Sequence, residues 1–85
     1  MPTISAFYGI LIQMFFSDHA PPHFHARYGE HKALVDIRKL ELIEGKPRRA
    51  LNLVLDWAEL HQPELLKDSQ LCQDMQQPQP IAPLE

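Results

Sequence analysis

The chain has 85 residues, with eight Lys and Arg, eleven Asp and Glu, and five His, so its formal net charge is −3 when the histidines are neutral. This length fits one small domain, and this charge excludes a uniformly basic, histone-like nucleic-acid binder. The single cysteine excludes an internal disulfide and a cysteine-based zinc site. No apolar run approaches the ~18 residues of a membrane span, and no basic residue precedes the first apolar stretch as in a signal peptide. We therefore expect a cytoplasmic protein that has no membrane partner.

The charge is divided unevenly along the chain. Residues 1–49 hold seven Lys and Arg against five Asp and Glu, together with four of the five histidines. Residues 50–85 hold one basic residue against six acidic ones. The first half is mildly basic and gains further positive charge as its histidines protonate below a pH of about 6.5. This division favours an anionic partner for the first half, although an ordinary solvated surface can carry the same asymmetry.

Residues 9–16, GILIQMFF, form the first strong signal. An apolar run of this length is typical of a strand that is covered on both faces. Residues 3–8 either extend this strand or form a short strand of their own. Pro21 and Pro22 then exclude a helix and predict a loop.

Residues 23–37 alternate between apolar and polar side chains on both sides of Gly29–Glu30. A glycine in the first central position suits a two-residue type II′ turn, because that position needs a positive φ. The sequence therefore predicts a hairpin that pairs Tyr28 with His31 at the turn and His23 with Asp36 at the open end.

The chain then changes from a strand pattern to a helical one. Residues 41–45 are predicted to form a last strand after a turn at Lys39–Leu40. Residues 47–61 follow a helical pattern that is apolar on most sides, which predicts burial by the sheet or by a partner subunit. A second, shorter helix is expected from Pro63 onward.

The whole pattern predicts one α+β domain over residues 1–75. Its core is expected to be a three- to four-stranded, mostly antiparallel sheet followed by two C-terminal helices on one face. Residues 76–85 are rich in Pro and Gln and predict a flexible tail.

The histidines form the most unusual cluster of the sequence. His23 and His25 are two residues apart on a predicted strand, so their side chains leave the same face about 6.5–7 Å apart at Cα. Asp18, His19 or Asp36 could complete the three or four ligands that zinc or another divalent metal needs. The alternative is a set of exposed sheet histidines beside a loop, with no cofactor.

The same face suits acid–base chemistry. A histidine that titrates near neutral pH can accept and donate a proton within one cycle, and the carboxylate of Asp36 opposite His23 would fix its tautomer. His23, His25 and Asp36 are therefore candidate catalytic residues for cleavage of a phosphodiester without a metal. The alternative is a cross-strand ion pair on a solvated face.

Four cations are candidates for binding RNA. Arg27 and Lys32 share the histidine face and could hold a phosphate. Arg48 and Arg49 come at the start of the first helix, where backbone N–H groups also suit a phosphate. All four also fit an ordinary solvated surface.

Two motifs carry a resemblance to a known family. DHAPPHFHARYG at residues 18–29 and PRRALNLVLDWAELH at residues 47–61 resemble the small bacterial proteins of the domain-of-unknown-function family DUF4160. The resemblance covers about residues 1–66. It implies a compact α+β domain, a small partner protein encoded by a neighbouring gene and, for some members, the role of a toxin component; no biochemical activity is established for the family.

These observations lead to two expectations for function. The first is a toxin-like component of a two-gene toxin–antitoxin module that acts by protein binding and by RNA binding or cleavage on its histidine face. The alternative is a non-enzymatic interaction module or a histidine-based divalent-metal-binding protein. Leu11, Phe15 and Leu55 lie on faces that a two-layer domain need not bury, which also allows a homo-oligomer.

Overall fold

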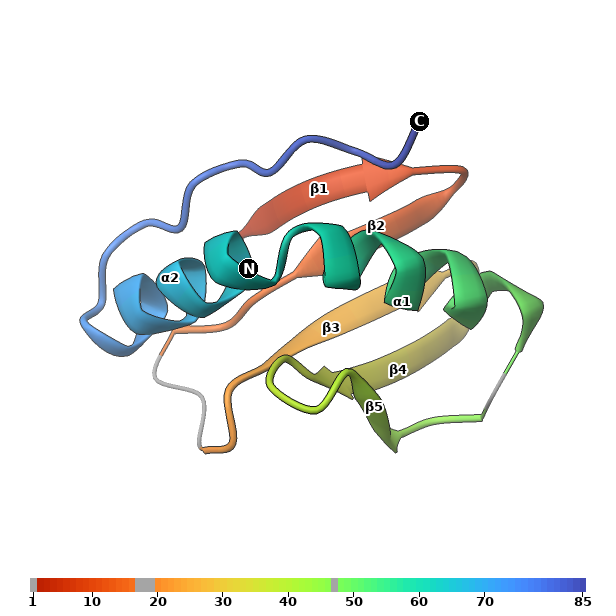
Figure 1. Ribbon diagram of the computed structural model, residues 1–85, viewed down its shortest axis with the longest axis horizontal. Helices are drawn as coiled ribbons and strands as arrows, with labels where there is room; N and C mark the ends of the chain where they lie inside the picture. The colour runs from red at the N-terminus through yellow and green to blue at the C-terminus, as the bar shows by residue number, and fades with distance from the viewer. Residues whose placement is uncertain (1, 17–19, 47) are drawn as a thin grey trace.

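Five antiparallel strands form one sheet in sequential order, and two helices follow them (Figure 1). The computed structural model describes residues 2–16, 20–46 and 48–85. The α+β class and the two C-terminal helices are as predicted, but the sheet has one strand more than expected because residues 3–8 contribute a strand of their own. The elements are β1 (Thr3–Phe7), β2 (Ile10–Gln13), β3 (His23–Tyr28), β4 (His31–Asp36), β5 (Glu41–Glu44), α1 (Arg49–Leu60) and α2 (Gln62–Gln73).

Two-residue turns close the first and third hairpins of the sheet. Between β1 and β2, Tyr8 and Gly9 have φ values of 50° and 78°, as a type I′ turn requires. Between β3 and β4, Gly29 has a φ of 59°. The register of this hairpin runs from Tyr28↔His31 to His23↔Asp36, which confirms the predicted pairing at both ends.

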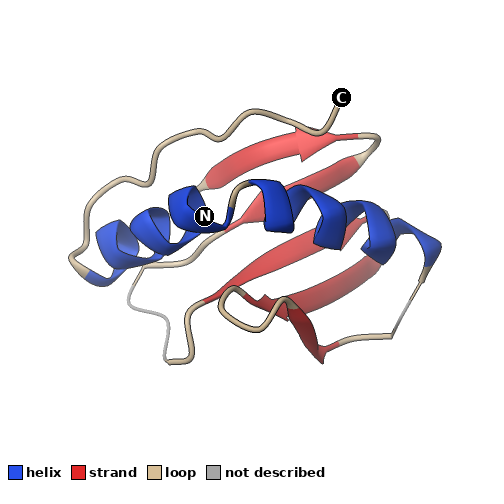
Figure 2. Cartoon of the chain, in the orientation of Figure 1, coloured by secondary structure: helices blue, strands red, loops and turns tan. Residues whose placement is uncertain are grey.

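Both helices lie on the same face of the sheet (Figure 2). Trp57 of α1 is fully buried there, with its ring 5.3 Å from that of Phe7 and 5.9 Å from that of Phe24. The other face is not covered in this way. Leu11 of β2 is 40% exposed, so the prediction of a strand covered on both faces is wrong for this position.

The apolar surface of α1 is wider than the part that the sheet buries. Val54, Trp57 and Ala58 are buried, whereas Leu53 is 37% exposed and Leu60 is 69% exposed. The sheet therefore buries one stripe of the helix surface. Leu51 and Leu55 are partly buried against the core, so Leu53 and Leu60 are the exposed leucines of this helix, and the predicted partner subunit stays a prediction.

Residues 76–85 contain neither helix nor strand, and they run back along β1 (Figure 1). The backbone N–H of Ile81 donates to the carbonyl of Ile4 at 2.8 Å, and the indole N–H of Trp57 donates to the carbonyl of Ala82 at 2.8 Å. Ile81 itself is 5% exposed. These contacts tie residues 81 and 82 to β1 and α1. The predicted flexibility of the segment concerns its motion and stays a prediction.

In the part of the chain that the structure describes, no helix combines the length and the apolar character that crossing a bilayer requires.

Candidate functional site

The face of the sheet opposite the helices carries the side chains that alternate with the core, and we call it the bare face. Its candidate residues are His23, His25 and Arg27 of β3 and Lys32 and Asp36 of β4. The predicted alternation is confirmed by burial, because Phe24 and Ala26 between them are buried against the helices. Two strands thus place five of the predicted site residues on one surface.

Three rings form a row on the bare face. The rings of Phe15 and His25 are stacked, with centroids 4.0 Å apart and planes 23° apart. The ring of His23 lies 5.3 Å from that of His25. Sequence reasoning treated Phe15 as a core or self-association residue and missed this stack. The sequence did hold a signal for it. Phe15 is two positions after Gln13 and four after Leu11, so in an extended chain the three side chains leave the same face.

The tautomer of His23 follows from its backbone contact. Its Nδ1 lies 2.8 Å from the carbonyl oxygen of Pro21. A carbonyl only accepts hydrogen bonds, so Nδ1 donates and the neutral ring keeps its lone pair on Nε2.

Asp36 lies opposite His23 in the register, but its carboxylate also has a structural role. Oδ1 accepts hydrogen bonds from the backbone N–H groups of Arg38 at 2.9 Å and Lys39 at 3.0 Å. These bonds close the turn between β4 and β5, and Asp36 is only 6% exposed. Its predicted catalytic pairing with His23 stays a prediction.

Arg27 and Lys32 are opposed in the register and place two positive charges on the bare face. Arg27 follows His25 by two residues on the same strand, so the two Cα atoms are about 6.5–7 Å apart. The described residues offer no carboxylate within ion-pair distance of either cation. A bound phosphate would therefore not have to displace an existing partner.

The other two predicted RNA-binding residues lie elsewhere. Arg48 has extended backbone angles and immediately precedes α1, and Arg49 is the first residue of that helix. Both line hollows on the helix-covered side of the molecule, together with His31 of the β3–β4 hairpin. The structure thus divides the predicted RNA-binding residues between two surfaces.

The predicted metal site falls partly outside the described residues, because His19 is one of those whose structure is not described. Within residues 2–16, 20–46 and 48–85, no three His, Cys, Asp or Glu side chains are grouped so that they could hold a metal ion. His23 and His25 supply two neighbouring imidazoles. The zinc hypothesis consequently depends on a third ligand such as His19.

A comparison with protein families gives a match over residues 9–68, more than half of the chain, to DUF4160, a domain of unknown function. The chain belongs to this family, which confirms the resemblance of its motifs. No curated protein and no solved structure matches it.

Proposed function

We propose that this DUF4160 protein binds single-stranded RNA on the bare face of its sheet, as the toxin-like component of a two-gene toxin–antitoxin module. The observation that carries the proposal is the stack of Phe15 on His25 beside two cations, Arg27 and Lys32, that have no carboxylate partner among the described residues. Unpaired bases stack on such rings, and each stacked base contributes about 1–3 kcal/mol to binding. The cations supply the phosphate contacts that fix the strand in place.

The two histidines also suit cleavage of the bound strand. His23 Nε2 would accept the proton of a ribose 2′-hydroxyl while the 2′-oxygen attacks the adjacent phosphorus. The bond from phosphorus to the 5′-oxygen breaks, and His25 in its protonated form would give that oxygen its proton. The products are a 2′,3′-cyclic phosphate and a free 5′-hydroxyl. Arg27 would stabilise the negative charge that develops on the phosphoryl oxygens.

Binding is tested with a fluorescently labelled single-stranded RNA and fluorescence anisotropy. Replacing Lys32 by Ala removes one phosphate contact, and we expect a weaker complex with a smaller dependence on salt. Lys67→Ala is the matched control, since it removes one exposed lysine from α2. Equal affinity of the two variants would contradict a binding site on the bare face.

The toxin-like role is tested by expression in a bacterial host. We expect the unaltered protein to slow growth and His23→Ala to abolish this effect while its thermal unfolding remains cooperative. Lys67→Ala again serves as the control. Growth inhibition that survives the loss of His23 would rule out the catalytic role of this histidine.

Partner binding is the other half of the proposed module. The exposed apolar side chains of the helices, Leu53 and Leu60, are available to the small protein encoded by the neighbouring gene or to a second copy of the chain. Co-purification of the two gene products, followed by size measurement of each alone and together, distinguishes these partners. A monomer that captures no neighbour product would contradict both.

A divalent-metal site is the second candidate, favoured by the 5.3 Å separation of the His23 and His25 rings. Calorimetric titration with zinc at neutral pH measures it directly. Binding that disappears in both His23→Ala and His25→Ala would support a metal-binding module. A protein that binds RNA but takes up no zinc would leave only the first proposal.

A further inference from the structure

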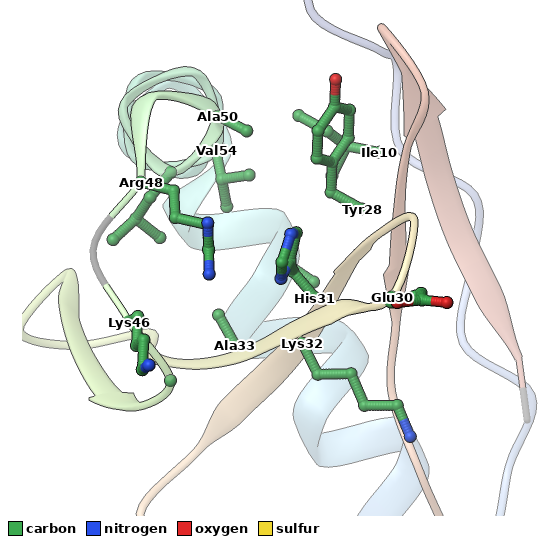
Figure 3. A pocket seen from close by; sticks show the side chains of 13 residues that line it. Ile10, Tyr28, Glu30, His31, Lys32, Ala33, Lys46, Arg48, Ala50 and Val54 are labelled. Carbon is green, nitrogen blue, oxygen red and sulfur yellow. The ribbon is translucent and has the colours of Figure 1, made fainter.

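A cavity of about 330 Å³ lies on the helix-covered side of the molecule, between the start of α1 and the β3–β4 hairpin (Figure 3). Its floor is apolar and includes Ala33 and Val54. A second hollow, of about 560 Å³, shares Tyr28, His31 and Arg48 with the first. The two hollows are therefore neighbours, and together we call them the depression. The volume of each lies in the range of about 300–1,000 Å³ that is usual for small-ligand sites.

Positive groups dominate the rim of this depression. Arg48 and His31 extend toward one another across the cavity, while the carboxylate of Glu30 points away from it (Figure 3). The guanidinium of Arg48 makes no hydrogen bond or ion pair with any residue that the structure describes, although its backbone carbonyl accepts from the Leu51 N–H at 2.9 Å. The first turn of α1 holds no acidic side chain, so nothing there neutralises the helix N-terminus. The mouth of the cavity therefore attracts an anion.

Two exposed aromatic side chains, Tyr28 and Tyr8, lie beside Arg48 and His31. Tyr28 is 48% exposed, and its ring rests on the turn at Gly9, where a Cβ atom would lie 3.5 Å from Cε1 of the ring. Tyr8, from the same turn, lines the second hollow and is 61% exposed. Large exposed rings beside an apolar floor offer flat surfaces to a planar ligand group.

We propose that this depression binds a nucleoside 5′-monophosphate. The phosphate lies between Arg48 and His31, because a guanidinium and an imidazole donor together suit its oxygens. The base lies against Tyr28 and the apolar floor. This site goes beyond the proposed function, since it is on the opposite side of the sheet and shares no side chain with the row of rings; of the residues proposed to bind RNA on the bare face, only Lys32 also borders the first cavity.

The probe is adenosine 5′-monophosphate, measured by calorimetry on the full chain, with adenosine and inorganic phosphate as partial ligands. We expect the monophosphate to bind more tightly than either part alone. Arg48→Gln should weaken it about tenfold or more, the effect of losing a charge-assisted hydrogen bond. Tyr28→Ala should weaken both the monophosphate and adenosine but not phosphate. Lys67→Ala is the control that should not change the affinity.

Amide chemical shifts locate the ligand even if a variant loses stability. We expect the monophosphate to shift the resonances of Tyr28, His31 and Arg48. Shifts confined to His23 and His25 would overturn the proposal by placing the ligand on the bare face, and so would absence of binding. RNA binding on the bare face is measured separately with the labelled single-stranded RNA, so absence of monophosphate binding would not decide it.

Discussion

The two faces of β3 have different roles although they belong to the same six residues. Phe24 is fully buried against Trp57 on the helix-covered face, and its neighbours His23 and His25 lie half-buried on the bare face. Because side chains alternate along a strand, one segment contributes to the core and presents titratable rings at the same time. The face on which a side chain of this hairpin lies therefore predicts the effect of its replacement. Replacing a residue on the covered face should lower stability, whereas replacing one on the bare face should weaken binding.

The largest effect expected from this comparison is that of Phe24→Ala. Truncating a fully buried phenylalanine costs about 3–5 kcal/mol, a large part of the ~5–15 kcal/mol that stabilises a domain. His25→Ala, one residue away, removes a partly exposed ring and its stack on Phe15, worth about 0.5–1.5 kcal/mol. Urea unfolding followed by circular dichroism measures both.

Phe24→Leu keeps the comparison measurable if the alanine variant does not fold. We expect this milder change still to lower the free energy of unfolding more than His25→Ala does. Equal losses at Phe24 and His25 would mean that the bare face is as important to the core as the covered face.

The second effect concerns the edge of the covered face, where Ile81 packs beside β1. We expect Ile81→Ala to cost about 2 kcal/mol, the lower end for a buried isoleucine, because a segment near the chain end can collapse into the space. The exposed Gln77→Ala in the same segment is the matched control. Hydrogen exchange of the Ile81 amide, which donates to Ile4, measures the contact directly. A stability loss no greater than that of Gln77→Ala would show that residues 76–85 do not stabilise the sheet.

The hairpin of β3 and β4 could be predicted from sequence because its determinants are local. Gly29 supplies the positive φ of the turn, and strict alternation fixes the register from Tyr28↔His31 to His23↔Asp36. The fold class was predictable for a similar reason, since strand and helix periodicities follow one another in order, whereas the family was predictable from the resemblance of the motifs at residues 18–29 and 47–61.

What could not be predicted depends on contacts between distant segments. An apolar run such as residues 9–16 has no alternation, so it predicted a strand covered on both faces and left open which of its side chains are exposed. That Phe15 stacks on His25 depends on the pairing of β2 with β3, which the run itself does not encode. The depression between Arg48 and His31 brings together a helix start and a hairpin turn that are far apart in sequence. The Pro- and Gln-rich composition of residues 76–85 gave no indication that Ile81 is buried.

The smallest effect expected concerns a charge on the covered side. Asp68 of α2 is 2% exposed, and its Oδ1 accepts a hydrogen bond from the Gln79 N–H at 2.8 Å. Its Oδ2 has no hydrogen-bond partner among the described residues. Burial raises the pKa of this carboxyl above its ordinary value, and the nearby charge of Glu64 adds to the shift. A carboxyl whose pKa is raised by folding favours the folded state in its protonated form. That contribution is complete below the unfolded pKa of about 3.9 and is lost as the pH rises through the folded pKa.

Asp68→Asn keeps an oxygen for the Gln79 N–H and removes the charge. We expect it to raise the free energy of unfolding at pH 7 by about 1 kcal/mol, the low end of the cost of an unsatisfied buried group. The gain should shrink as the pH falls toward 4, because the carboxyl of the unaltered protein then becomes neutral as well. The exposed Asp56→Asn on α1 should show no such pH-dependent gain in urea unfolding. An equal gain at pH 7 for both asparagine variants would contradict this prediction. It would mean that the covered side tolerates a carboxylate as readily as the solvent-exposed surface does. The contrast between the two faces would then not extend to charge.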